Sequence, residues 1–186
     1  MGIGTEGSAG PSPVMTLALA PSSGRAETEV CSSLLDGDDG DRSVLYVALT
    51  GAAVRRVGRT PGAAGEGAAT VVRVGESAGG GTTAGPDGVE VRTVSDPTNL
   101  TRLGIEFTDW LAGTEGADRV VCLHSLDAFL QYVAADRLFR FLSVMSDHLR
   151  EAGARAHVHA DPAACEASTL ATLRQLFDEV VEEESP

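Results

Sequence analysis

Short runs of apolar and β-branched residues recur along this chain, and most of them end in glycine, proline or acidic residues. Runs of this length between turn residues are typical of strands. The run SVLYVALT at residues 43–50 has almost no polar alternation, as expected for a central parallel strand that is covered on both faces. The pattern predicts strands at residues 14–20, 43–50, 69–74, 89–94, 119–123 and 155–160.

Apolar residues spaced three and four positions apart predict helices between these strands. Residues 27–35 can form a helix that presents Val30, Cys31 and Leu34 to the core, and residues 54–57 show a weaker helical pattern. Asp96 is placed to cap the next helix, with Pro97 in its first position. That helix buries one apolar stripe, made of Leu100, Leu103, Phe107, Trp110 and Leu111.

Three more helices follow in the C-terminal half. We expect a short helix over residues 126–133, a longer one from Asp136 that Gly153 stops, and a final helix after Asp161. Asp127 is expected to cap the short one. The long helix presents Leu138, Phe139, Leu142, Met145 and Leu149, and the final one presents Leu170, Leu173, Leu176, Phe177, Val180 and Val181.

Strands that alternate with helices imply right-handed crossovers, and hence an α/β fold with a mainly parallel sheet in a three-layer αβα arrangement. We expect a flexible tail at residues 1–13, one domain at 14–183 with a flexible loop at 75–88, and an acidic tail at 184–186. The loop contains three consecutive glycines but leads into a strand. A phosphate-binding loop leads into a helix, so this loop is not expected to bind phosphate.

All fourteen basic side chains are arginine, against 27 acidic ones, and the formal net charge is −13. The absence of lysine excludes Schiff-base chemistry and the usual P-loop contact with phosphate. The acidic charge argues against binding to nucleic acid or to an anionic membrane, and the Arg55, Arg56 and Arg59 cluster is expected to be a solvated helix face. The composition resembles that of halophilic archaeal proteins, and no apolar run is long enough to cross a bilayer, so we expect a cytoplasmic protein.

Cys31, Cys122 and Cys165 are odd in number and lack CxxC spacing, so the sequence predicts neither a disulfide framework nor a cysteine zinc site. They are expected to be small buried side chains. His124, His159, Asp161 and Cys165 could approach one another at the carboxyl ends of the strands and hold a transition metal. Histidines with structural partners are the favoured interpretation, so no metal ligand is predicted.

Ser125, His159 and Asp161 form the alternative set for nucleophilic catalysis at the same edge of the sheet. The GxSxG turn that would expose the serine is absent, so this hypothesis is disfavoured.

Residues 119–130, RVVCLHSLDAFL, look like the Walker B strand and following turn of the KaiC/RecA-like P-loop ATPases, and the order of elements over residues 14–181 resembles the degenerate members of that superfamily in haloarchaea. The superfamily strand ends in Asp-Ser, whereas this one ends in His124-Ser125. Overlaid on the Walker A loop, Gly24 matches the second glycine, but Arg25 replaces the lysine and Ala26 the Ser/Thr. The resemblance therefore implies a RecA-like fold without the parts that bind magnesium and phosphate.

The preferred interpretation is a pseudo-ATPase with no cofactor, in which Gly24, Arg25, His124 and Ser125 form a vestigial nucleotide edge. Such a domain would act through protein contacts, in regulation or signalling, with another protein or a second copy as partner. Tyr132, Phe139 and Phe141, which lie close to Arg140, could supply that contact, although most aromatic residues are expected in the core. The alternative is a nucleotide sensor or metal-dependent enzyme that uses the His124/His159 edge.

Overall fold

The computed structural model describes residues 14–21, 29–31, 33, 42–49, 69–75, 83–84 and 89–183. Several predictions fall outside these ranges: the two tails, the helix at residues 54–57 with its arginine cluster, and most of the loop at 75–88.

Eight strands form one sheet, in the order β4-β5-β3-β2-β6-β7-β1-β8. Every neighbouring pair is parallel except β4 with β5. The sheet thus confirms the α/β class and the parallel arrangement, with β2 between two parallel neighbours as its sequence predicted. The strands are β1 (Met15–Leu19), β2 (Arg42–Ala48), β3 (Ala69–Val74), β4 (Thr83–Ala84), β5 (Glu90–Val94), β6 (Asp118–His124), β7 (Arg155–Ala160) and β8 (Glu179–Glu182).

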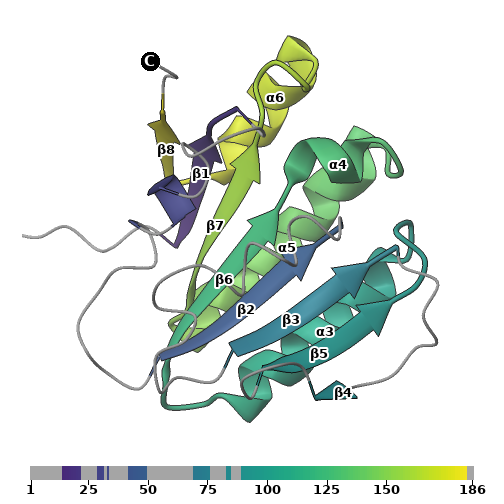
Figure 1. Ribbon diagram of the computed structural model, residues 1–186. Coiled ribbons are helices and arrows are strands. Elements are labelled where there is room, and N and C mark those ends of the chain that lie inside the picture. The colour runs from purple at the N-terminus through teal and green to yellow at the C-terminus, as the bar shows by residue number, and fades with distance from the viewer. Residues whose placement is uncertain are drawn as a thin grey trace, which may run out of the picture.

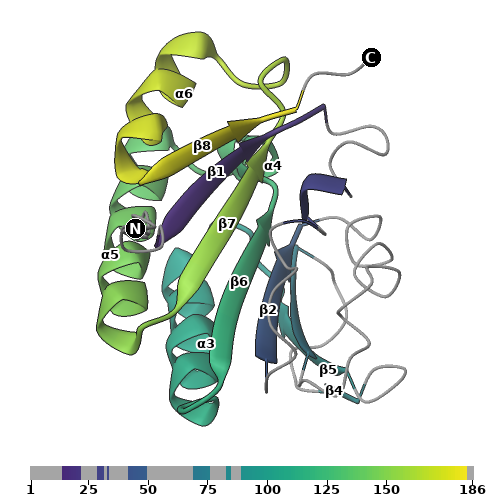
Figure 2. The same cartoon turned by 90° about the vertical axis from the view of Figure 1, so that its left-hand side faces the viewer.

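Helices α3 (Leu100–Gly113), α5 (Ala135–Ala152) and α6 (Ala167–Leu173) cover one face of the sheet, and α4 (Leu126–Leu130) follows the end of β6 (Figures 1 and 2). The helical residues 29–31 and 33 lie on the opposite face (Figure 2). Alternate residues of each strand point to opposite faces. As a result, Val121 and Leu123 of β6 join the large core under the helices, whereas Cys122 joins a smaller cluster with Cys31 on the other face.

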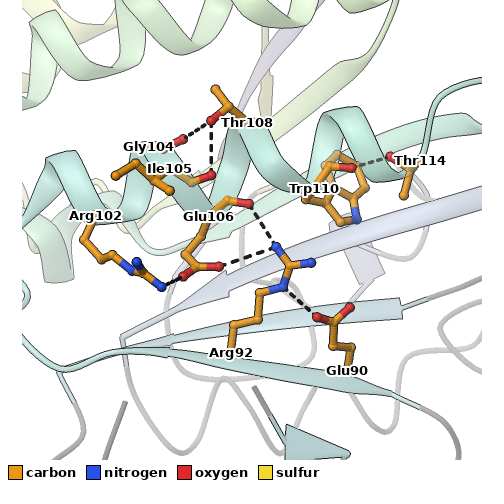
Figure 3. A network of polar contacts seen from close by, with 9 residues as sticks. All are labelled: Glu90, Arg92, Arg102, Gly104, Ile105, Glu106, Thr108, Trp110 and Thr114. Atoms are coloured by element: carbon orange, nitrogen blue, oxygen red, sulfur yellow. Dashed lines mark hydrogen bonds and ion pairs between the residues drawn. The ribbon is translucent and has the colours of Figure 1, made fainter. Parts of the chain in front are cut away.

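A buried carboxylate fastens α3 to strand β5 (Figure 3). Glu106 is 6% exposed and accepts hydrogen bonds from Arg102, one turn earlier, and from Nη1 of Arg92 at 3.4 Å. The Arg92 Nε donates to Glu90 at 2.8 Å, so this guanidinium bridges two carboxylates. Because a buried charge is costly unless it is paired, this network accounts for a glutamate on the inner face of α3.

The helix that was expected to begin at Pro97 begins at Leu100 instead, and the prediction that Asp96 caps it is wrong. The Asn99 side chain accepts the Arg102 N–H at 2.9 Å and is the cap. Asp96 accepts the backbone N–H and the hydroxyl of Thr98, which closes a turn before the helix. The predicted apolar stripe of α3 is buried throughout.

The C-terminal prediction is wrong in one main respect, because Val180 and Val181 lie in strand β8 and not in a helix. Helix α6 ends at Leu173, a 3₁₀ turn η2 (Arg174–Leu176) follows, and β8 then pairs in parallel with β1. Helix α4 is also shorter than expected, and the short strand β4 lies in the predicted loop.

The long helix α5 agrees with the prediction at its end, where Gly153 has φ 64° in the left-handed region that glycine tolerates. Phe107, Trp110 and Phe129 are buried, as their helical spacing suggested, whereas Tyr132 is 55% exposed and lies outside the core, as proposed for one aromatic near Arg140. No helix within the described ranges combines the length and the apolar character that a membrane crossing requires.

Candidate metal centre

Strands β6 and β7 each place two potential metal ligands on the face of the sheet that lies opposite α3 and α5. Cys122 and His124 are two residues apart on β6, and His157 and His159 are two residues apart on β7. The two strands are parallel neighbours, and Cys122 lies directly beside His157 in the register. The period of two along a strand therefore gathers all four side chains on one face.

Cys31 reaches the same place from the helical segment on that face. Its Sγ lies 3.6 Å from Sγ of Cys122, 3.7 Å from Nε2 of His124 and 3.5 Å from Nε2 of His157. Cys31 is 3% exposed and its neighbour Val30 is 1% exposed, whereas Glu29 faces solvent. An amphipathic turn of helix thus presents its thiol to the two strands.

These separations match those of ligands around one tetrahedral zinc ion. With Zn–S near 2.3 Å and Zn–N near 2.05 Å, tetrahedral angles place two sulfur ligands about 3.8 Å apart, and a sulfur and a nitrogen about 3.6 Å apart. The contacts of Cys31 with Cys122 and His124 lie within about 0.2 Å of those values. Ligand atoms of Cys31, Cys122, His124 and His159 all lie within 4.8 Å of one another.

His159 supplies an independent sign that a ligand is needed here. Its ring stacks on that of His124, with centroids 4.1 Å apart and planes 7° apart, and the residue is 2% exposed. Both of its ring nitrogens are buried and make no hydrogen bond within the described ranges. Burial, with His124 nearby, lowers the pKa of His159 to about 4, so the imidazole is neutral and keeps a free lone pair. A buried nitrogen without a partner is costly, and a metal ion would satisfy it.

The environment of Cys31 favours its deprotonated form, the thiolate. The hydrogen bond with Cys122, aided by contacts with His124 and His157, lowers the pKa of the Cys31 thiol against the opposing effect of burial. Neither cysteine forms a disulfide with another described residue, and Cys122 is fully buried. Because the thiolate is the form that binds metals, this environment favours the ligating state of Cys31.

The structure therefore changes the ligand set of the metal-site alternative that the sequence disfavoured. It brings His124 and His159 together, as the sequence suggested, but joins them with Cys31 and Cys122 and not with Asp161 and Cys165. Cys165 packs against the core on the helix-covered face, where burial raises the pKa of its thiol to about 11. The sequence signals were the pairs CLH on β6 and HVH on β7, but the ligand that completes the set lies in an element far away in the chain.

The carboxylates at the end of the sheet have a different role. The prediction that Asp127 caps helix α4 is wrong, since its Oδ1 accepts the backbone N–H of Asp161 at 3.1 Å. Ser125 occupies the N-cap position, and its side chain makes no capping bond. Asp127 thus links the start of α4, which follows β6, to the residue that follows β7. This hydrogen bond joins the chain segments that leave the carboxyl ends of the two strands.

Of the four residues predicted for the vestigial nucleotide edge, the structure describes two. His124 turns into the buried cluster, whereas the adjacent Ser125 is half-buried at the start of α4. Gly24 and Arg25 lie outside the described residues, so their part in such an edge stays a prediction.

Comparison with known proteins places the whole domain in one family. The model of a family of unknown function (DUF7504) matches residues 15–183. A search of curated proteins finds no match to the chain.

Proposed function

The chain belongs to the DUF7504 family, and we propose that it is a non-catalytic α/β domain built around a buried zinc centre whose ligands are Cys31, Cys122, His124 and His159. The observation that carries this proposal is the convergence of two thiols and two imidazoles, from three separate elements, within 4.8 Å of one another. Donor atoms of these types in a group of four are the usual ligands of structural zinc.

Charge balance favours a divalent ion. Two thiolates and two neutral imidazoles carry a charge of −2, which Zn²⁺ brings to zero, whereas a monovalent ion would leave a net negative charge. All four ligands are at most 7% exposed, and an uncompensated charge at such a depth is strongly unfavourable. Sulfur and imidazole ligands in tetrahedral geometry are also the set that selects zinc among the common divalent ions.

Burial supports a structural role for the ion. A catalytic zinc keeps one coordination position for water or substrate, whereas a structural zinc is surrounded by four protein ligands. Here four candidate ligands lie within 4.8 Å of one another, which is the number that a closed site needs, and the buried His157 lies against Cys31 on the same face. The ion would act as a cross-link between the helical segment at Cys31 and strands β6 and β7. Cys31 and Cys122 are 91 positions apart, so the cross-link would close a long loop.

The same cluster bears on the resemblance to P-loop ATPases. His124 stands where that resemblance expects the magnesium-binding acid. Its Nε2 atom contacts Sγ of Cys31 in the buried cluster. The carboxyl ends of β1 and β6 lie at the same end of the parallel sheet, with β7 between the two strands, which supports a RecA-like arrangement. We therefore retain the proposal of a domain that does not hydrolyse ATP and acts through protein contacts in regulation.

Metal analysis of the purified protein tests the zinc centre. We expect one zinc ion per chain. Replacement by Co²⁺ should give the visible d–d bands of a tetrahedral site and a thiolate-to-metal charge-transfer band. Cys122→Ser should lose both signals, whereas Cys165→Ser, which removes a thiol on the other side of the sheet, should keep them. Absence of bound metal in protein purified without chelator and then offered zinc would refute the proposal.

A matched pair on strand β7 identifies the second imidazole ligand. His159→Asn should abolish stoichiometric zinc binding, whereas His157→Asn should retain it. In the described part of the chain both buried nitrogens of His159 lack a hydrogen-bond partner, while Nε2 of His157 already contacts the Cys31 thiol at 3.5 Å. Retention of zinc by both variants would contradict the assignment of a histidine from β7.

A further inference from the structure

A groove of about 700 Å³ is open to solvent and is lined by residues of α3 and α5. These two helices cover the face of the sheet opposite the metal cluster (Figure 2). Ile105 of α3 and Val144 of α5 line it and are 44% and 56% exposed. They are two of the four large hydrophobic side chains that are exposed in the described part of the chain. Phe141, which is half-buried, adds an aromatic surface between them. Exposed apolar side chains that gather in one groove mark a binding surface more often than scattered ones do.

Gly104 lines the floor of the groove, and because glycine has no side chain it leaves this part of the groove unfilled. This residue lies inside α3, where glycine is less favourable than alanine by about 0.5–1 kcal/mol. A Cβ atom at this position would meet only Phe141, at 3.8 Å, which is an ordinary contact. Packing inside the domain therefore does not require glycine here, but a longer side chain would narrow the groove.

The charge on the rim is opposite to that of the chain as a whole. Arg137, Arg140 and His148 line the groove, and none of the described residues that line it is acidic, although acidic residues outnumber arginines by 27 to 14 in the sequence. Arg137 makes a hydrogen bond to a backbone carbonyl at 3.4 Å. Arg140 pairs with Asp136, but both side chains are about 70% exposed, so this pair is weak and can exchange for another carboxylate.

From these contacts we propose that the groove binds an acidic amphipathic helix of a partner protein. The apolar side chains of that helix would lie against Ile105, Phe141 and Val144, and its carboxylates would meet Arg137 and Arg140. An amphipathic helix laid in an apolar groove is a common mode of peptide recognition. This site is separate from the zinc centre, and it gives the protein contacts suggested by the sequence a definite location.

The arginines on the rim also argue against a second copy of this chain. Two grooves packed face to face about a two-fold axis would bring Arg137 and Arg140 of both copies together. Like charges opposed across an interface are unfavourable. A separate protein with an acidic helix satisfies both the apolar surface and the arginines.

A pair of synthetic helices tests the proposal in solution. One labelled peptide carries leucines at positions i, i+3, i+4 and i+7 flanked by glutamates, and the other has the same leucines flanked by lysines. The folded protein should bind the acidic peptide about tenfold more tightly, since two exposed charge pairs are gained in one case and two repulsions in the other. In spectra of methyl-labelled protein, the signals of Ile105 and Val144 should shift as the acidic peptide binds.

Two variants connect any binding to the groove. Arg137→Glu/Arg140→Glu changes exposed side chains only and should reverse the preference towards the basic peptide. Gly104→Ala should retain the fold and weaken binding of both peptides, because the added methyl group narrows the floor. The proposal is overturned if the two peptides bind equally, if neither binds, or if neither variant changes binding. Dimerisation that the arginine variant abolishes would assign the groove to a second copy and would also overturn it.

Discussion

Replacement of His159 by leucine distinguishes a metal centre from a cluster of buried polar side chains. Leucine has a similar size but no nitrogen. If no ion binds, the substitution removes two buried ring nitrogens that lack partners. Each such group costs about 1–3 kcal/mol, so the variant should be as stable as the native protein or more stable, whether or not zinc is present.

If zinc binds, the result depends on the metal. At a zinc concentration about 1,000 times the dissociation constant, an ion that binds only the folded state adds about 4 kcal/mol of stability. For a domain of this size, 1 kcal/mol moves the melting temperature by about 2–4 °C. The native protein should therefore melt about 8–16 °C higher with zinc than with chelator. His159→Leu should lose most of this difference and, in chelator, should melt no lower than the native protein.

Differential scanning calorimetry of both proteins, with zinc and with chelator, measures these four temperatures. His157→Leu is the control, because it removes a histidine from the same face of the same strand and should keep the zinc-dependent rise. A native protein whose melting temperature does not respond to zinc would refute the reasoning. So would a His159→Leu variant with the full native response.

Three further predictions concern stability, each measured by chemical denaturation. Asp178→Asn should cost about 1–2 kcal/mol at pH 7, because the carboxylate accepts two N–H groups from the start of β1. These bonds lower the pKa of Asp178, so its contribution is present above the unfolded pKa of about 4, and the difference between native protein and variant should shrink as pH falls below that value. Equal costs at pH 7 and pH 3 would contradict this. Glu106→Gln should cost about 2–4 kcal/mol and Glu90→Gln under about 1 kcal/mol, since only Glu106 is buried; equal effects would be evidence against the network. Gly153→Ala should cost about 1 kcal/mol because φ is positive there, whereas Gly113→Ala should not destabilise; a neutral Gly153 variant would exclude strain at that cap.

The elements with strong local patterns could be predicted from the sequence. Strand β3 has the predicted bounds, and the apolar stripe of α3 is buried, because hydrophobic spacing alone determines which face of an element is covered. The start of α3 was placed wrongly because Asp96-Pro97 and Asn99 both offer a plausible cap, and the choice depends on the turn that Thr98 closes.

The elements that depend on distant partners could not be predicted in the same way. Val180 and Val181 continue a helical spacing, yet they form a strand because the edge of β1 is available to pair with them. The metal ligands show the same limit. Each strand carries a recognisable pair, but Cys31 stands alone in its helix, and only the folded sheet brings its thiol to His124 and His157. Asp127 follows the same rule. Its place in the sequence predicts a cap on its own helix, but its hydrogen-bond partner is Asp161, 34 positions away.

The position of β1 has a consequence for how the domain folds during synthesis. This strand is made first, but both of its partners, β7 and β8, are made last. The ribosome must therefore release nearly the whole domain before β1 can enter the sheet. Until then its apolar residues and backbone groups lack the partners that they have in the sheet, so the pairing of β1 is a late step in folding.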